Sequence, residues 1–130
     1  MDIIQVPVSP GEVLDKITIL EIKSERISDA GKLANVKREL ELLQASWKQS
    51  VTEDETVRRI HDELKTINEA LWEIEDDIRD KERVKEFDQQ FIDLARNVYF
   101  TNDRRSDVKK QLNLHLGSQI IEEKSYQDYS

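Results

Sequence analysis

Apolar residues recur at steps of three and four positions between residues 57 and 78, and this pattern constrains the fold more than any other feature. The series consists of Val57, Ile60, Leu64, Ile67, Leu71, Ile74 and Ile78. Such steps place side chains on one face of an α-helix. A second series consists of Leu33, Val36, Leu40, Leu43 and Trp47. The two series predict two long helices that pack together as an antiparallel hairpin.

Capping residues indicate where the helices begin. N-cap patterns occur at Ser9-Pro10-Gly11-Glu12, at residues 28–31, at residues 52–55 and at Thr101-Asn102-Asp103. The apolar pattern slips between residues 79 and 84, which predicts a bend or a break there. Gly117 is suited to end the last helix, which we expect to start at residues 101–103.

The chain of 130 residues is 37% hydrophobic and 37% charged, with only 3 Gly and 2 Pro, a balance typical of long helices. We expect a single all-α domain over residues 1–130, an antiparallel helical bundle of about four to five helices with a long helical hairpin. Residues 1–8 are expected to form an extended N-terminal arm, because Pro7 and Pro10 favour extended backbone before them. Residues 118–130 are expected to form a C-terminal tail.

Charge and composition exclude several function classes. The 28 acidic and 20 basic side chains give a net charge of −8, which opposes nucleic-acid binding because affinity there comes from phosphate neutralisation. The chain has no cysteine, so disulfides, thiolate metal sites and cysteine nucleophiles are excluded. Its start lacks the features of a signal peptide, and no apolar stretch approaches the ~20 residues of a membrane span. We therefore expect a cytoplasmic protein with no membrane segment.

The predicted first helix carries apolar side chains on two faces. One face carries Val13, Ile17, Leu20 and Ile27. Ile19 and Ile22 lie roughly opposite, so the helix needs cover on both sides, either from the N-terminal arm or from a second subunit. The apolar seams favour a non-enzymatic interaction or assembly module that forms a homo-oligomer, a dimer, through Ile19 and Ile22, or that binds a protein partner. Under this hypothesis the double substitution Ile19→Asp, Ile22→Asp gives a folded monomer.

Polar residues on the predicted third helix form two groups. Glu69, Glu73, Asp76 and Asp80 lie opposite the apolar seam. Their spacing also fits a Mg²⁺ site, but water solvates that face, and we expect no metal and no cofactor. His61, Asn68 and Glu75 follow seven-residue steps along a shoulder of the seam, in line with Trp72. Half-buried polar groups need partners, so these three either fix the helix register through hydrogen bonds or contribute to a ligand site.

The strongest candidate for a binding site is the predicted start of the last helix. It consists of Arg96, Tyr99, Asn102, Arg104 and Arg105. Arginines in a first helical turn are unfavourable unless an anion compensates, so a phosphorylated or carboxylated metabolite would suit the guanidinium groups and the free amides. In the alternative, Asp103 and Asp107 provide that compensation through ordinary capping and surface ion pairs. This site makes a small-molecule binding protein or enzyme the alternative function, although no complete catalytic motif occurs.

Four stretches of the chain are similar to known proteins. They are Val6–Lys23, Leu71–Asp76, Tyr99–Arg105, and Gly117-Ser118 with Glu122–Tyr126. Together they resemble short bacterial proteins catalogued as a domain of unknown function, which implies one small helical domain and no established activity to transfer. The helix from Leu14 to Arg26 also resembles the first helix of helical chorismate mutases. That resemblance implies Arg26, Lys37 or Arg38 as cations for a dicarboxylate, without the family's fuller set.

Overall fold

The computed structural model describes residues 1–129, which contain four α-helices and no strand. The helices are α1 (Pro10–Arg26), α2 (Ala30–Ser50), α3 (Glu55–Arg83) and α4 (Gln89–His115). The described chain is therefore an all-α helical bundle, as the apolar periodicity predicts, with four helices. None of the described helices is both long and apolar enough to cross a membrane.

Each helix begins at an N-cap side chain that accepts a hydrogen bond from the backbone amide three residues later. The N-caps are Ser9, Asp29, Asp54 and Asp88. Ser9 accepts from the amide of Glu12 at 3.2 Å, and Pro10 occupies the first helical position, which confirms the predicted start of α1. α3 ends at Arg83, within the predicted break between residues 79 and 84.

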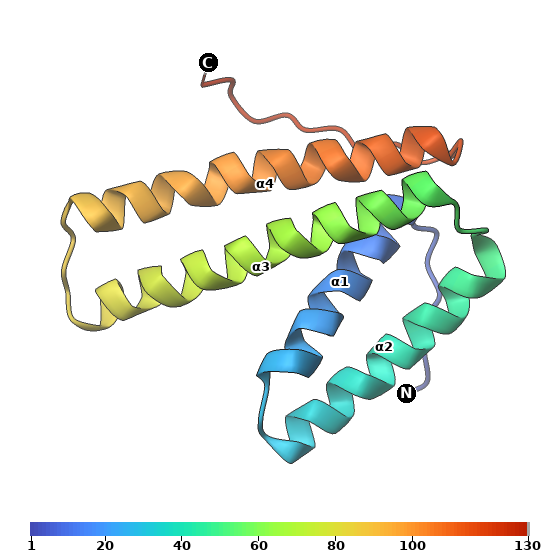
Figure 1. Ribbon diagram of the computed structural model, residues 1–130, viewed down its shortest axis with the longest axis horizontal. Helices are drawn as coiled ribbons and strands as arrows, with labels where there is room; N and C mark the ends of the chain where they lie inside the picture. Colours follow the sequence, from blue (N-terminus) through green and yellow to red (C-terminus); the bar gives the residue numbers. More distant parts are fainter. Residues whose placement is uncertain (130) are drawn as a thin grey trace.

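The helices pair differently from the hairpin that the sequence predicts. α2 packs along α1, and α3 pairs with α4 as a long antiparallel hairpin, so the predicted hairpin of the second and third helices is wrong (Figure 1). α1 also packs against both α3 and α4, so α1 and α4 together cover the apolar stripe of α3. Of the residues in α2, only Trp47, near its C-terminal end, is fully buried in the common core.

α4 runs without interruption through the segment predicted to cap a last helix, and that prediction is wrong. Thr101 lies inside α4 and is buried, and Asp88 supplies the cap instead. The apolar steps of α4 continue when Thr101 and Arg105 are included: Phe91, Leu94, Val98, Thr101, Arg105, Val108 and Leu112. One continuous stripe stabilises one helix of 27 residues. Residues 101–105 consequently present no free amides of a helix start.

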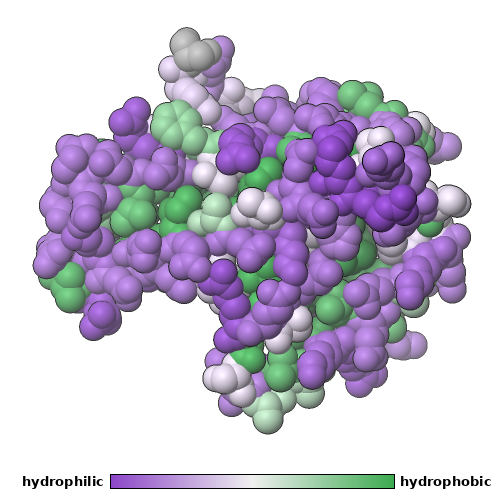
Figure 2. All heavy atoms as spheres, viewed as in Figure 1, coloured by the Kyte–Doolittle hydropathy of each residue, from purple (hydrophilic) through white to green (hydrophobic). Residues whose placement is uncertain are grey.

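The core lies where α1 crosses the hairpin of α3 and α4. It contains Leu14, Ile17, Trp47, Val57, Ile60, Leu64, Ile67, Val108 and Leu112. Between residues 69 and 100, by contrast, none of the described apolar side chains is fully buried. We call this segment the far half of the hairpin. α2 does not lie beside it, and α1 reaches only its first residues, as far as Asp76 (Figure 1). Apolar side chains show in its seam (Figure 2).

The two ends of the described chain contain no helix or strand over residues 1–8 and 118–129. Residues 1–8 are exposed, and the extended arm expected for them stays a prediction. The C-terminal segment is attached to α4. Its contacts with α4 include Lys110–Glu123 at 3.1 Å, Lys124–Asp103, and the rings of Tyr99 and Tyr129 at 5.3 Å. The predicted tail over 118–130 thus lies along α4 up to residue 129, and residue 130 lies outside the described residues.

Candidate ligand-binding site

A buried polar cluster lies where α1, α3 and α4 meet. Asn68 on α3 donates from Nδ2 to Oδ1 of Asp15 and to Oγ1 of Thr18 on α1, both at 2.9 Å. The exposed fractions of Asp15, Thr18 and Asn68 are only 4%, 0% and 5%. Buried polar groups need such partners, so these hydrogen bonds fix the register of α1 on α3.

Two cations of α4 face the buried carboxylate of Asp15. Arg105 Nε lies 3.8 Å from Asp15 Oδ1, and Lys109 Nζ lies 3.9 Å from Asp15 Oδ2. Lys109 also donates to Glu12 Oε2 at 2.6 Å, and this hydrogen bond holds the pKa of the Glu12 carboxyl below its usual value. Arg105 Nε, in contrast, is buried and has no hydrogen-bond partner among the described residues.

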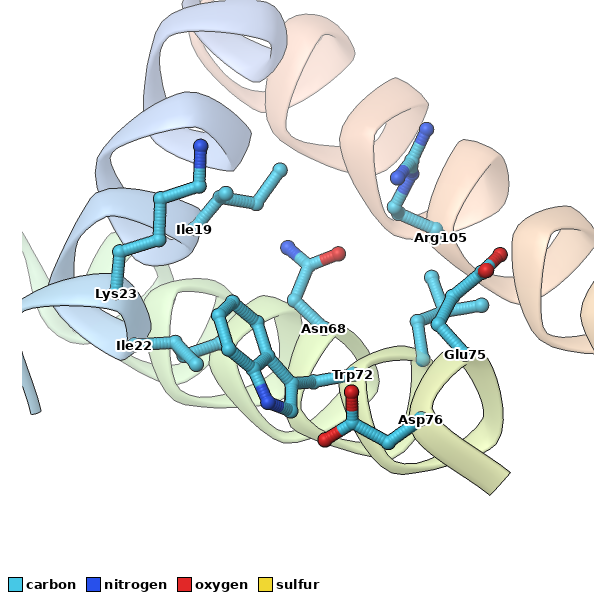
Figure 3. A pocket seen from close by; sticks show the side chains of 9 residues that line it. Ile19, Ile22, Lys23, Asn68, Trp72, Glu75, Asp76 and Arg105 are labelled. Atoms are coloured by element: carbon cyan, nitrogen blue, oxygen red, sulfur yellow. The ribbon is translucent and has the colours of Figure 1, made fainter. Parts of the chain in front are cut away.

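A cavity of about 300 Å³ opens between α1, α3 and α4 beside this cluster (Figure 3). Its apolar wall is formed by Ile19, Ile22, Leu71 and Trp72. Its polar lining is formed by Lys23, Asn68, Glu75, Asp76 and Arg105. The Arg26 guanidinium covers the Trp72 ring at 5.7 Å from its centroid. A mainly apolar cavity with a few convergent polar groups is the usual form of a small-molecule site.

The lining determines what this cavity can do chemically. No hydroxyl, thiol or imidazole group is among its lining side chains. Its carboxylates, Glu75 and Asp76, lie on α3, and its cations, Lys23 and Arg105, come from α1 and α4 (Figure 3). The arrangement is suited to holding a charged ligand by ion pairs and apolar contact. No group of three potential metal ligands occurs within the described residues.

The three polar residues on the shoulder of α3 are only partly brought together. Asn68 and Glu75 both line the cavity. His61 lies two turns before Asn68 and bonds instead to Glu21 Oε1 on α1, with Nε2 at 2.7 Å. The register function expected as one alternative applies to His61 and Asn68, which both link α3 to α1.

The hydrogen bond from His61 to Glu21 raises the pKa of the imidazole above 6.5. A raised pKa in the folded state means that the pair stabilises the fold fully below about pH 6.5 and loses this contribution as the pH rises through the folded pKa. We expect an NMR titration of the His61 ring to give the raised pKa, and Glu21→Gln to lower it. Glu25→Gln, one turn further along α1, is the matched control and should leave the titration unchanged. An unaltered His61 titration in Glu21→Gln would contradict this assignment.

Of the five residues proposed for an anion site, only Arg105 lines the cavity. Arg96 stacks on the Phe100 ring at 5.6 Å, and Arg104 is exposed. The Tyr99 ring contacts the Phe100 ring, with centroids 4.8 Å apart, and Asn102 is half-buried. The proposed geometry of a helix start is wrong because α4 is continuous, so its amides are bonded within the helix.

The second apolar face of α1 is covered within the chain. Ile22 has an exposed fraction of 1%, and Ile19 is half-buried at the cavity. Ile22 therefore cannot contribute a surface seam between subunits in this fold, which corrects the expectation for that residue. The cations implied by the chorismate mutase resemblance do not converge. Arg26 pairs with Glu73, while Lys37 and Arg38 are exposed on α2.

Sequence reasoning missed Lys23 and the buried Asp15 as parts of this site, although Trp72 was placed in line with the polar residues of α3. A usable signal existed for Arg105, because it occupies a seam position in the apolar steps of α4. A charged side chain at such a position is costly and therefore marks a special contact. No comparable signal existed for Lys23, whose place in the cavity depends on how α1 crosses the hairpin.

Comparison with known proteins gives one match. The family of unknown function DUF6165 matches residues 4–129, nearly the full chain. No curated protein and no solved structure matches the chain. The bacterial origin expected from the resemblance stays a prediction.

Proposed function

The chain belongs to the family of unknown function DUF6165, and we propose that it acts as a small-molecule-binding protein. The ligand has an apolar body and an acidic group, and it occupies the cavity between α1, α3 and α4. The observation that carries this proposal is the guanidinium of Arg105, whose buried Nε lacks a hydrogen-bond partner among the described residues. Arg105 is also one of the residues that line the cavity.

Physical arguments support a ligand for Arg105. A buried donor without a partner costs about 1–3 kcal/mol, and an acidic oxygen would remove this cost. Asp15 faces Arg105, but at 3.8 Å from Nε it gives an ion pair without a hydrogen bond. A carboxylate or phosphate matches the planar donors of arginine and would form the missing bond. Trp72 and Ile22 beside it would bury the apolar part of the ligand.

We expect Arg105→Gln to abolish the thermal stabilisation that an acidic ligand gives to the protein. The probes are benzoate, 3-phenylpropionate and phenyl phosphate in a thermal-unfolding screen. A ligand at 100 times its Kd adds about 2.7 kcal/mol, or roughly ten degrees in Tm for a domain of this size. Arg104→Gln is the matched control, because Arg104 is the exposed neighbour on the same helix. Equal ligand-induced shifts in both variants would overturn the assignment of Arg105.

Self-association is a second candidate function, favoured by the far half of the hairpin. Ile78 and Leu94 are only half-buried there, and Phe87 has an exposed fraction of 55%. Two antiparallel helices alone leave part of the apolar surface between them exposed to water. The same hairpin of a second copy would cover this surface and form a four-helix bundle with it. This surface replaces the seam expected at Ile22. The cytoplasmic location, the lack of a cofactor and a binding partner of another kind stay predictions.

We expect Phe87→Asp to convert a dimer into a folded monomer. The charge would face the partner's apolar seam, whereas in a single chain Phe87 is mostly in water, so the fold should be retained. Sedimentation velocity at several concentrations measures the mass, and circular dichroism measures the helix content. Leu42→Asp, at a comparably exposed position on α2, is the control. A wild-type protein that stays monomeric at every concentration would contradict self-association.

A further inference from the structure

We propose that the ligand of this cavity is a zwitterion, an apolar amino acid or a close relative, with an ammonium group as well as an acidic group. This inference rests on the proposed function and specifies its ligand class. The lining carries two cations and two carboxylates, so its formal charge is balanced. A ligand with an acidic group alone would pair with the cations, but it would leave the Asp76 carboxylate at the cavity without a hydrogen-bond partner and Glu75 with only the exposed Arg79.

The acceptors for an ammonium group lie on one helix. Asp76 lines the cavity, and its carboxylate makes no hydrogen bond or ion pair with a described residue within the usual distances. Glu75 is engaged only by the exposed Arg79 of the following turn, at 3.3 Å. Asn68 adds a third acceptor. Its Nδ2 donates to Asp15 and Thr18, which fixes the orientation of the amide group (Figure 3). Its Oδ1 accepts no hydrogen bond from a described residue.

The donors for the acidic group come from the other two helices. The Lys23 ammonium on α1 lines the cavity and makes no hydrogen bond or ion pair with a described residue. Arg105 on α4 supplies the unpartnered Nε. The acidic and ammonium groups of an amino acid share one carbon atom, so donors and acceptors must converge on a single point. In Figure 3, Asn68 lies between α1 and α4, with Lys23 on one side of it and Arg105 on the other.

The apolar part of the lining limits the side chain of the ligand. Ile19, Ile22, Leu71 and Trp72 offer aliphatic and aromatic surface, and none of them offers a hydrogen-bonding group apart from the indole nitrogen. A cavity of about 300 Å³ lies at the small end of ligand sites and suits a single amino acid rather than a peptide or nucleotide. We therefore assign an aliphatic or aromatic side chain to the ligand.

Ligands that lack one of the two charged groups measure how much the acidic group and the ammonium group each contribute to binding. The probes are L-phenylalanine, 3-phenylpropionate, which lacks the amine, and phenethylamine, which lacks the acid, with L-leucine and L-tryptophan as further amino acids. Calorimetry or amide NMR shifts of the full chain measure the Kd. We expect at least one of the amino acids to bind about tenfold tighter than its counterpart lacking either charge.

Variants of α3 assign the ammonium site. We expect Asp76→Asn to weaken binding of the amino acid about tenfold and to leave 3-phenylpropionate binding unchanged or stronger. Asp77→Asn is the control, since Asp77 is the adjacent exposed acid and does not line this cavity. If 3-phenylpropionate binds as tightly as phenylalanine, the zwitterion inference fails and the proposed function stands. If none of the probes binds at millimolar concentration, both are overturned.

Discussion

Replacing Ile22 by Asp is expected to unfold most of the protein. Ile22 has an exposed fraction of 1%, so the substitution removes about 1.5–3 kcal/mol of apolar burial. It also places a charge among Ile19, Trp72 and Leu71 at the cavity wall, where burial among apolar side chains disfavours an ionised carboxylate. The total approaches the 5–15 kcal/mol that typically stabilises a domain. Urea unfolding followed by circular dichroism measures the loss.

The same substitution separates two views of α1. If the second apolar face of this helix were a subunit seam, Ile22→Asp would give a folded monomer. In the fold described here it gives an unfolded or strongly destabilised chain instead, because α3 covers Ile22 within one chain. Leu42→Asp is the control on exposed α2 surface and should change the free energy of unfolding by no more than about 0.5 kcal/mol. A folded, monomeric Ile22→Asp protein with wild-type stability would contradict the packing of α1.

Local signals in the sequence predict the helices well, but not how they pair. The capping box at Ser9 and the apolar steps of α3 act within a few residues, so both are readable from the chain alone. Pairing depends on which stripes meet in space. The stripe of α3 fits α4 as well as it fits α2, and nothing local distinguishes the two. In the structure α1 and α4 cover α3, and α1 can do so while it also packs against α2 because it has apolar residues on two faces.

The full length of α4 could be predicted from its apolar steps of three and four residues, but Thr101 and Arg105 interrupt that pattern with polar side chains. Thr101-Asn102-Asp103 is a good N-cap pattern, and that local preference suggested a new helix. The structure instead buries Thr101 in the stripe of a continuous helix. Tertiary packing outweighs a capping preference worth about 1 kcal/mol, since the stripe buries several side chains at once.

The candidate site could be predicted only in part, for a geometric reason. Seven-residue spacing along one helix predicts Asn68 and Glu75, and an expected helix start, which the structure does not contain, led to Arg105; all three line the cavity. Lys23 and Trp72 lie on different helices, and the angle at which α1 crosses the hairpin brings them together. Periodicity along one helix carries no information about that angle. For a site formed by three helices, the sequence therefore predicts a member where a polar or charged residue interrupts or borders the apolar pattern of its own helix. Arg105 is such a residue.

Replacing Gly11 by Ala is expected to cost several kcal/mol, although alanine is the better helix former by about 1 kcal/mol. A Cβ atom at Gly11 would lie 2.7 Å from the backbone oxygen of Lys109 and 2.9 Å from Asn113 Oδ1. The backbone of α4 cannot yield as a flexible side chain can, so α1 must move away from α4. That movement would also break the hydrogen bond from the Gly11 amide to Asn113 Oδ1 at 2.7 Å, and it would separate Asp15 from its cations.

Gly31 provides the matched control for this prediction. A Cβ atom there meets only Asp29 Oδ2, at 3.5 Å, so Gly31→Ala in the first turn of α2 should leave stability unchanged or raise it by up to about 1 kcal/mol. The opposite signs of the two substitutions would show that contact with α4, and not helix propensity, requires glycine at position 11. Chemical denaturation of both variants measures this difference. If Gly11→Ala proved as stable as the wild type, α1 could not lie against α4 as described, and the cavity between them would lose its basis.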